Sequence, residues 1–171
     1  KLMKRRFNPK FYESEYFYRW DSFLHSKKLQ ELHEKYDYKI VFSPHPQIRP
    51  YLEGFNLPNY IIIPSVEMSM QKLFCESSLM ITDYSSVAFE MAVLKKPVIY
   101  YQFDKDELFA KHTYTQGYFD YNKDGFGIVV LDIDNLLYEL KMKLQNHSFK
   151  NNFLTPKANS LEKVTQAILF I

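Results

Sequence analysis

The sequence predicts an α/β fold, a Rossmann-like parallel sheet with helices on both faces. Short apolar runs typical of buried strands alternate along the chain with segments of helical spacing, and this alternation favours parallel strands joined by crossover helices. The stretch from Leu79 to Tyr101 shows the pattern most fully: an apolar run, a hydroxyl-rich turn, a helical segment and a second apolar run. With 171 residues, 46% hydrophobic and 25% charged, the chain has the size and composition of one globular domain.

The N-terminal part is predicted to pass from an irregular segment into a helix and then a strand. Residues 1–20 are expected to form an irregular, basic and aromatic linker, and residues 21–171 a single Rossmann-like domain. Asp21 is a suitable N-cap for a helix over residues 22–36, because apolar side chains recur near one face there. The apolar run over residues 38–43 then predicts a strand, which the prolines that follow it bring to an end.

The remaining elements alternate between strands and helices. Short apolar runs predict strands over residues 60–63, 79–81, 98–101 and 127–131. Helical spacing, capping aspartates, and basic or proline residues at the ends predict the helices. These helices are expected over residues 68–76, 87–94, 132–145 and 161–171.

Composition excludes several classes of function. The net charge of +2 offers no electrostatic argument for binding nucleic acid. Cys75 is the single cysteine, so no intrachain disulfide can form, and its apolar helical surroundings predict a buried, unreactive thiol. No apolar run approaches the ~20 residues that a membrane span needs. The aromatic share of 18% is high; we expect a core rich in Tyr and Phe, the alternative being an aromatic surface that meets a membrane or a partner domain.

The turn from Thr82 to Ser86 is the strongest candidate for a binding site. It follows a predicted buried strand and opens a predicted helix, so it lies at the carboxyl edge of the sheet, where α/β domains bind ligands. Free N–H groups at a helix start, together with hydroxyl groups, suit an anion and predict a phosphorylated ligand. The alternative is simple helix capping by Ser85 or Ser86, which is compatible with phosphate binding. Glu90, one turn further on, is a candidate for a ribose contact or an ordinary exposed carboxylate.

Two other loops are expected at the same edge. In the first, His45 and Arg49 follow a strand, and both side chain types can neutralise charge that builds on a phosphoryl group. The second begins at Gln102–Asp106 and continues through His112–Tyr121, whose aromatic side chains either line a pocket or pack on the sheet. Further on, two glycines bracket Phe126 and permit a close approach of the backbone.

Several familiar signals are absent from the sequence. There is no Gly-rich Lys loop and no GxGxxG, so a dinucleotide redox role has little support. No Cys/His cluster has zinc spacing. Asp132-Ile133-Asp134 has a form that holds a metal in some nucleotide-sugar enzymes, but it opens a predicted helix, where N-capping is the favoured interpretation. We therefore predict no metal and no cofactor.

The stretch from Ile81 to Asp104, ITDYSSVAFEMAVLKKPVIYYQFD, resembles the signature of the CDP-glycerol glycerophosphotransferase family. These enzymes polymerise the glycerol-phosphate or ribitol-phosphate backbones of teichoic acids and some capsules. Ser43–Pro46 (SPHP) and Gly117–Gly127 match the family in order and approximate spacing, and the likeness covers residues 11–144. The resemblance implies that this chain, which begins without Met, is the C-terminal, nucleotide-binding domain of a two-domain, B-type glycosyltransferase (GT-B) fold.

The resemblance also implies a reaction. An acceptor hydroxyl attacks the β-phosphorus of CDP-glycerol, or of CDP-ribitol, and CMP leaves. His45 matches the catalytic His-Pro histidine that acts at the diphosphate. The implied substrate-binding residues are Arg49, Thr82, Asp83, Ser85, Ser86 and Glu90. Glu90 departs from the Asp common in the family, and Phe126-Gly127-Ile128 stands where many members carry Pro-Gly-Pro.

Implied partners follow from the same family. They are a CDP-polyol donor, a lipid-linked polyol-phosphate or saccharide acceptor, and the N-terminal domain of the same parent chain. The parent is expected in the cytoplasm, in peripheral contact with the inner face of the cell membrane. A second family histidine belongs to the N-terminal domain, so this chain alone is expected to be inactive.

Two other functions stay open at this point. One is a UDP-sugar-dependent GT-B glycosyltransferase or epimerase half, since that fold also places a Ser/Thr turn before a helix that carries a carboxylate. The other is a non-catalytic membrane-docking module, which the basic start and the aromatic content suggest.

Overall fold

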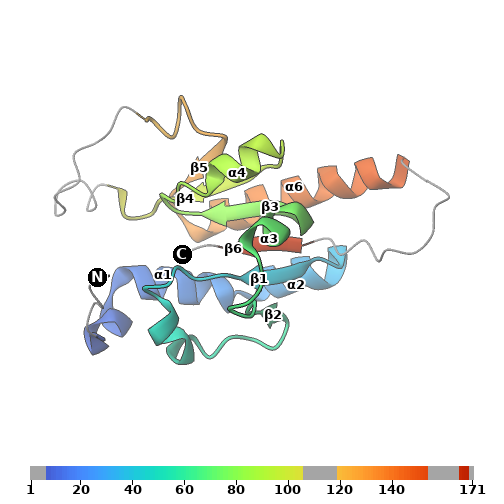
Figure 1. Cartoon of the computed structure of the whole chain (residues 1–171). Coiled ribbons are helices and arrows are strands. Elements are labelled where there is room, and N and C mark those ends of the chain that lie inside the picture. The colour runs from blue at the N-terminus through green and yellow to red at the C-terminus, as the bar shows by residue number, and fades with distance from the viewer. Residues whose placement is uncertain (1–6, 106–118, 154–165, 170–171) are drawn as a thin grey trace.

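The computed structural model describes residues 7–105, 119–153 and 166–169 and forms one six-stranded sheet (Figure 1). In spatial order the strands are β2 (Ile61–Ile62), β1 (Lys39–Phe42), β6 (Gln166–Leu169), β3 (Ser77–Thr82), β4 (Val98–Tyr101) and β5 (Gly127–Val130). Every pair of neighbouring strands is parallel. The predicted parallel sheet is therefore confirmed. A parallel sheet brings all strand carboxyl ends to one edge, where ligands bind.

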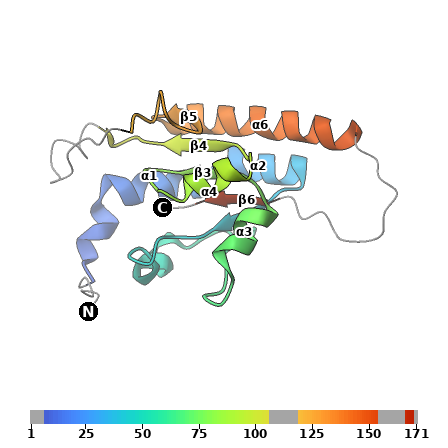
Figure 2. The same cartoon turned by 45° about the horizontal axis from the view of Figure 1, so that its top comes forward.

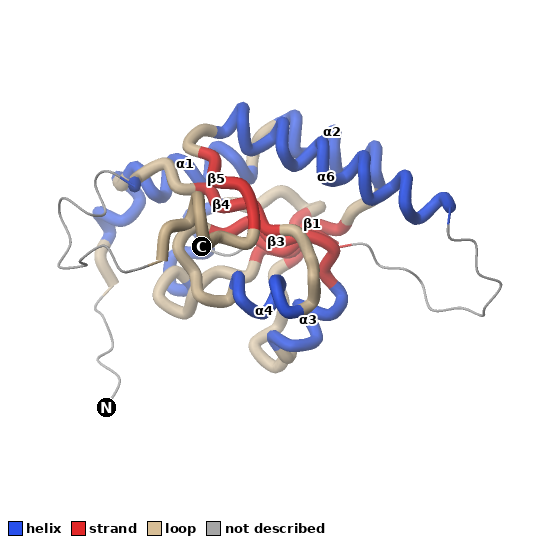
Figure 3. The backbone as a smooth tube through the Cα atoms, turned by 90° about the horizontal axis from the view of Figure 1, so that it is seen from above, coloured by secondary structure: helices blue, strands red, loops and turns tan. Residues whose placement is uncertain are grey.

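Helices cover both faces of this sheet. One face packs against α1 (Glu15–Leu24), α2 (Lys27–Tyr36) and α6 (Ile133–Phe153), and the other against α3 (Met70–Glu76) and α4 (Ala88–Val93). Figure 2 shows α6 above the sheet and α3 below it, and Figure 3 shows the two groups of helices on opposite sides. The side chains of β3 and β4 alternate between the two cores as a strand of period two requires.

The N-terminal segment is more ordered than the sequence predicts. A 3-10 turn over Pro9–Glu13 precedes α1, and the Ser14 Oγ caps that helix by accepting a hydrogen bond from the Phe17 N–H at 3.1 Å. Asp21 lies inside α1 and does not cap the next helix, so the prediction of one helix over 22–36 is wrong. The prediction of an irregular linker over residues 1–20 is therefore wrong for the part that forms these two elements, and Trp20 is fully buried in the core.

The C-terminal prediction is also wrong for the residues described there. Residues 161–171 are expected to be helical, yet Gln166–Leu169 form β6, paired in parallel with β1 on one side and β3 on the other. The other residues of that predicted helix lie outside the described part of the chain. A central parallel strand is covered on both faces, so a short apolar run such as QAIL carries no alternation that separates strand from helix.

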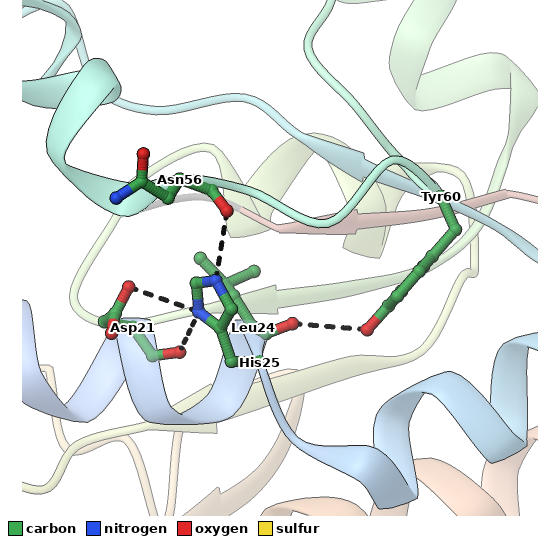
Figure 4. Close-up of polar contacts among 5 residues, drawn as sticks. All are labelled: Asp21, Leu24, His25, Asn56 and Tyr60. Carbon is green, nitrogen blue, oxygen red and sulfur yellow. Dashed lines mark hydrogen bonds and ion pairs between the residues drawn. The ribbon is translucent and has the colours of Figure 1, made fainter.

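A polar joint connects the end of α1 to the loop before β2 (Figure 4). The His25 Nδ1 lies 3.0 Å from the Asp21 carbonyl oxygen and 3.2 Å from its carboxylate, and the Nε2 lies 3.2 Å from the Asn56 carbonyl oxygen. The Tyr60 hydroxyl donates to the Leu24 carbonyl at 3.2 Å. These contacts hold the helix end against a segment more than thirty residues away in the chain.

Two details of the remaining helices bear on the sequence predictions. Asp132 caps α6, because its Oδ1 accepts a hydrogen bond from the Asn135 N–H at 2.8 Å, as the capping interpretation predicts. Cys75 is exposed rather than buried, since it lies on the outer side of α3. No helix among the described residues has the length and apolar character needed to cross a bilayer.

Candidate functional site

Three loops follow strand ends at the carboxyl edge of the sheet. They are the loop after β1 that carries His45, the Thr82–Ser86 turn after β3, and the loop after β4 that begins at Gln102. In Figure 1 the arrowhead of β3 points to this edge, on the left. The sequence places these three loops correctly. Residues 106–118, which contain the predicted His112–Tyr118 segment, lie outside the described part of the chain.

Asp83 organises the turn after β3. One carboxylate oxygen accepts a hydrogen bond from the Tyr16 hydroxyl at 3.0 Å, and the other accepts from the Tyr84 N–H at 2.5 Å. Burial raises the pKa of Asp83, and burial together with the adjacent Asp83 carboxylate raises the pKa of Tyr16 well above its usual value. Tyr16 therefore stays protonated and serves as the donor of this pair.

Two further hydrogen bonds hold the backbone of the turn, and a third holds the Tyr84 side chain. The Gln102 Nε2 donates to the Asp83 carbonyl at 3.2 Å, and the Tyr121 hydroxyl donates to the Tyr84 carbonyl at 3.0 Å. The Tyr84 hydroxyl in turn donates to Asp104 at 3.1 Å. Burial and the Asp104 carboxylate raise the pKa of Tyr84, so its hydroxyl also keeps its proton. The turn is thus fixed from three separate segments of the chain.

Beneath the turn lie two buried polar atoms with no hydrogen-bond partner among the described residues. These are the Thr82 Oγ1 and the Gln102 Oε1, and both side chains are fully buried. Thr82 pairs in register with Tyr100 of β4, two residues before Gln102. The floor of the turn therefore holds unused hydrogen-bonding capacity.

The two serines of the turn are only lightly engaged within the protein. The Ser85 Oγ accepts from the Val87 N–H at a long 3.4 Å, and Ser86 is exposed, with no side-chain hydrogen bond among the described residues. No side chain caps α4. The capping alternative is therefore weakly realised, and the serine hydroxyls remain accessible to a ligand.

His45 is exposed at the start of a turn after β1. Its Nδ1 accepts a hydrogen bond from the Gln47 N–H at 3.2 Å, and its carbonyl accepts from the Ile48 N–H at 2.8 Å. With Nδ1 as acceptor, a neutral ring carries its proton on Nε2, which can donate to a ligand oxygen. Arg49 is half-buried at the start of the next 3-10 helix, Arg49–Phe55.

The structure brings these candidates to one edge but not into contact. β6 lies between β1 and β3, so the His45 loop and the Thr82–Ser86 turn are separated by two strand spacings, about 10 Å. That separation suits a ligand that reaches from one loop to the other. Glu90 is exposed on α4, and its side chain makes no ion pair or hydrogen bond among the described residues.

Sequence reasoning missed the residues that position the turn. Tyr16 falls in the segment expected to be irregular, so nothing in the pattern connects it with Asp83, 67 positions further along. Tyr121 and Gln102 lie in segments that the sequence marks as loops of interest, yet their roles depend on contacts across the sheet edge. The described residues contain no cluster of side chains suited to a metal ion.

Comparison with known proteins identifies what the chain is similar to. Residues 6–164 match the family model described as CDP-Glycerol:Poly(glycerophosphate) glycerophosphotransferase. The minor teichoic acid biosynthesis protein GgaB of Bacillus subtilis (strain 168) is 37% identical over 174 residues, which cover 96% of this chain and 19% of that protein.

Two polymerases match shorter stretches. The teichoic acid poly(ribitol-phosphate) polymerase of Bacillus spizizenii is 33% identical over 51% of this chain and 14% of its own length. The teichoic acid poly(glycerol phosphate) polymerase of Staphylococcus epidermidis is 32% identical over 61% of this chain and 14% of its own length. The chain thus spans less than a fifth of each of these three relatives.

A solved structure shares the fold. The wall teichoic acid polymerase TagF aligns with a TM-score of 0.51 at 22% sequence identity, over 77% of this chain and 44% of that chain. At this level of identity the likeness concerns the fold alone, and it agrees with the parallel sheet described above.

Proposed function

This chain belongs to the CDP-glycerol:poly(glycerophosphate) glycerophosphotransferase family, and on that premise we propose that it is the nucleotide-binding part of a teichoic acid polyol-phosphate transferase. Its donor is CDP-glycerol or CDP-ribitol, and its parent releases CMP. The relatives named for glycerol-phosphate and for ribitol-phosphate polymers both support a polyol phosphate as the transferred group.

The observation that carries this proposal is the clamped turn at the carboxyl edge. Hydrogen bonds from Gln102 and Tyr121 fix its backbone, while the hydroxyls of Ser85 and Ser86 are left accessible. Groups that are held in place before the ligand arrives need no reorganisation when charge builds on a phosphoryl group. The diphosphate of the donor is the ligand group that this arrangement suits best.

In the proposed transfer an acceptor hydroxyl oxygen forms a bond to the β-phosphorus, and the bond from that phosphorus to the bridging oxygen of CMP breaks. The hydroxyl proton is lost to a base or to solvent, and CMP leaves with the bridging oxygen. The His45 Nε2–H donates a hydrogen bond to the diphosphate, and Arg49 adds positive charge on the same loop. Most of the rate enhancement then comes from position and charge rather than from covalent chemistry.

The parent protein is proposed to work at the cytoplasmic face of the cell membrane. Its acceptor would be a lipid-linked polyol-phosphate or saccharide, and an N-terminal domain would complete the cleft. Wall polymer or capsule is the proposed product. These statements extend the family membership to the whole protein, of which the chain spans a small part.

Replacing His45 by Ala in the full-length parent tests the assignment of the catalytic residue. Loss of one fixed donor at the reacting phosphoryl group is expected to lower kcat by about 10²–10³. Turnover is measured as CMP release from CDP-glycerol and from CDP-ribitol. Nucleotide affinity and thermal unfolding are measured alongside. Unchanged kcat in a folded, nucleotide-binding variant would contradict the role of His45.

A further inference from the structure

A hollow lies at the amino edge of the sheet, opposite the edge that carries the Thr82–Ser86 turn. It has a volume of about 580 Å³ and lies between the loop that enters β4, the residue before β5, and the middle of α6. Its lining includes three lysines with an amide and two apolar residues: Lys95, Lys96, Lys143, Asn146, Pro97 and Phe126. We call this the lysine hollow. Among the residues that the structure describes, no acidic residue lines it, so this lining carries unbalanced positive charge.

Lys96 is fixed in the wall of the hollow. Its Nζ donates to the Phe74 carbonyl at 2.7 Å and to the Cys75 carbonyl at 2.6 Å, in the last turn of α3. Carbonyls at a helix end attract a cation and hold it in place. Burial lowers the pKa of Lys96. The protein groups around its ammonium group therefore do not fully replace the water that burial removes.

Lys95 occupies a backbone position that glycine usually takes. Its φ is 55°, and it ends α4 with the two hydrogen bonds of a Schellman motif, from the Lys95 N–H to the Ala92 carbonyl and from the Lys96 N–H to the Met91 carbonyl, both at 2.9 Å. A side chain in this left-handed region is strained. The chain therefore keeps an exposed lysine at a place where glycine would be more stable.

The third lysine comes from a distant part of the chain. Lys143 is half-buried on α6, and neither Lys95 nor Lys143 makes an ion pair within the part of the chain that the structure describes. Other exposed lysines do pair, such as Lys28 with Asp134 at 2.7 Å. Cations from two distant parts of the chain thus converge on one hollow, with no counter-charge among the described residues that line it.

We propose that the lysine hollow binds a phosphodiester group of the polyol-phosphate chain, at a site separate from the nucleotide site. The identity of this ligand rests on the proposed function, while the anion-binding character rests on the lysines alone. A polyol-phosphate chain carries one negative charge per repeat, so a segment beyond the reacting end needs positive charge elsewhere on the enzyme. The hollow and the Thr82–Ser86 turn lie at opposite edges of the sheet. A ligand bound at one site therefore leaves the other site open.

The test is calorimetric titration of the full chain with three probes: a synthetic glycerol-phosphate oligomer, inorganic phosphate, and CDP-glycerol. The Lys95→Gln/Lys143→Gln variant leaves Lys96, and hence the end of α3, intact. We expect its affinity for the oligomer to fall on the order of tenfold, because each exposed ion pair contributes up to about fivefold. Its affinity for CDP-glycerol should not change. Lys10→Gln/Lys27→Gln, with the same loss of charge at exposed sites elsewhere, is the control.

A second variant separates binding from folding. Lys95→Gly removes both the side chain and the backbone strain, so its thermal midpoint should rise while its affinity for the oligomer falls. Ser85→Ala/Ser86→Ala should show the reverse of the lysine variant, with CDP-glycerol binding lost and oligomer binding kept. If the unmodified chain binds the oligomer but not CDP-glycerol, the proposed function fails and the inference about the hollow stands.

Two outcomes would overturn the inference. One is oligomer affinity that falls equally in the control variant, which would show a diffuse charge effect. The other is binding to a membrane surface instead of the polymer. Lipid headgroups present the same phosphodiester chemistry, and the apolar side chains of Val93 and Leu94 are exposed beside the lysines. Binding to anionic vesicles but not to neutral vesicles or to the soluble oligomer, with dependence on Lys95 and Lys143, would replace the polymer by a membrane surface.

Discussion

At the scale of single residues, the site depends on side chains that hold the Thr82–Ser86 turn rather than on the turn alone. Tyr121 is the clearest case. Its hydroxyl donates to the Tyr84 carbonyl, and its ring packs against Tyr84 and Tyr100 with centroids 5.8 and 5.0 Å away. The ring secures packing and the hydroxyl secures the backbone, so the two contributions can be separated by one substitution.

Tyr121→Phe is expected to keep the ring contacts and lose the hydrogen bond. The free energy of unfolding should fall by about 1 kcal/mol, and affinity for CDP-glycerol should fall severalfold because the turn is less well held. Chemical denaturation and calorimetry measure the two effects. Tyr138→Phe is the matched control, since Tyr138 is 58% exposed and its hydroxyl makes no hydrogen bond among the described residues. Equal effects in the two variants would refute the positioning role of Tyr121.

The residue scale is also where sequence reasoning reaches its limit. The hydroxyl-rich turn can be recognised because its residue types follow a buried strand. The partners of that turn cannot, because Tyr16, Gln102 and Tyr121 come from segments that only the folded chain brings together. The burial predicted for Cys75 is likewise wrong, because the apolar spacing of α3 does not specify which side of so short a helix meets the sheet.

At the scale of elements, β5 depends on a close approach of two backbones. A Cβ on residue 127 would lie 1.8 Å from the Val98 carbonyl oxygen of β4, far inside contact distance. The neighbouring Gly125 is similarly confined, with the Tyr121 carbonyl oxygen 2.1 Å from the place of its Cβ. The two glycines that bracket Phe126 therefore serve the close approach that the sequence predicts.

Gly127→Ala is expected to separate β5 from β4 and to lower the free energy of unfolding by more than about 2 kcal/mol, because backbone atoms cannot move aside as a flexible side chain can. Ile128→Ala, at an exposed position of the same strand, should cost much less. Denaturant titration of both variants measures the difference. Similar stabilities for the two would show that β5 does not rely on this approach.

The contacts of His25 at the end of α1 predict that the stability of the fold depends on pH. Burial lowers the pKa of His25, but hydrogen bonds to the Asp21 and Asn56 carbonyls and the Asp21 carboxylate outweigh it, so the pKa is raised above 6.5. Both ring nitrogens face oxygen acceptors, which favours the doubly protonated ring. Because the folded pKa is the higher one, this stabilisation is complete below pH ~6.5 and disappears as pH rises through the folded value.

The unfolding free energy measured from pH 5.5 to 8.5 should therefore fall more for the wild type than for His25→Gln. The difference is expected to be small, since the His25 side chain is 38% exposed and solvent screens its interactions. Parallel pH profiles for the two proteins would contradict the assigned contacts.

The bounds of the helices and strands show where the residue pattern of the sequence predicts structure well. Strands β1, β3 and β4 and helices α3 and α4 lie within a few residues of their predicted positions, because turn or capping residues mark their ends. The predicted helix 22–36 failed because the break at His25 and Ser26 has no proline or glycine to announce it. The strand Gln166–Leu169 failed because a central parallel strand lacks the alternation that identifies strands with one exposed face.

At the scale of the whole molecule, the parallel sheet creates two chemically different edges. At the carboxyl edge lie the His45 loop, the Thr82–Ser86 turn and the loop at Gln102. The lysine hollow lies at the amino edge. Topology of this kind follows from the alternation of strands and helices and was predictable. The order of the strands was not, because β6 comes last in the chain and yet lies between β1 and β3.

That order shapes the proposed site. With β6 inserted between them, the His45 loop and the turn lie about 10 Å apart, a span that a diphosphate with its attached groups can bridge. The sequence placed both loops at one edge, but their separation became visible only with the sheet assembled. The family model matches residues 6–164, which include both loops.

We propose that the Thr82–Ser86 turn binds the diphosphate of a cytidine nucleotide, and calorimetric titration of the full chain measures this binding. The titrants are CDP-glycerol, CMP, UDP and UDP-N-acetylglucosamine, applied to the wild type, to Ser85→Ala/Ser86→Ala, and to the control Ser65→Ala/Ser69→Ala. We predict cytidine-selective binding that is lost in the first variant and kept in the control. Uridine selectivity, no binding of any titrant, or equal binding by the two variants would contradict the claim.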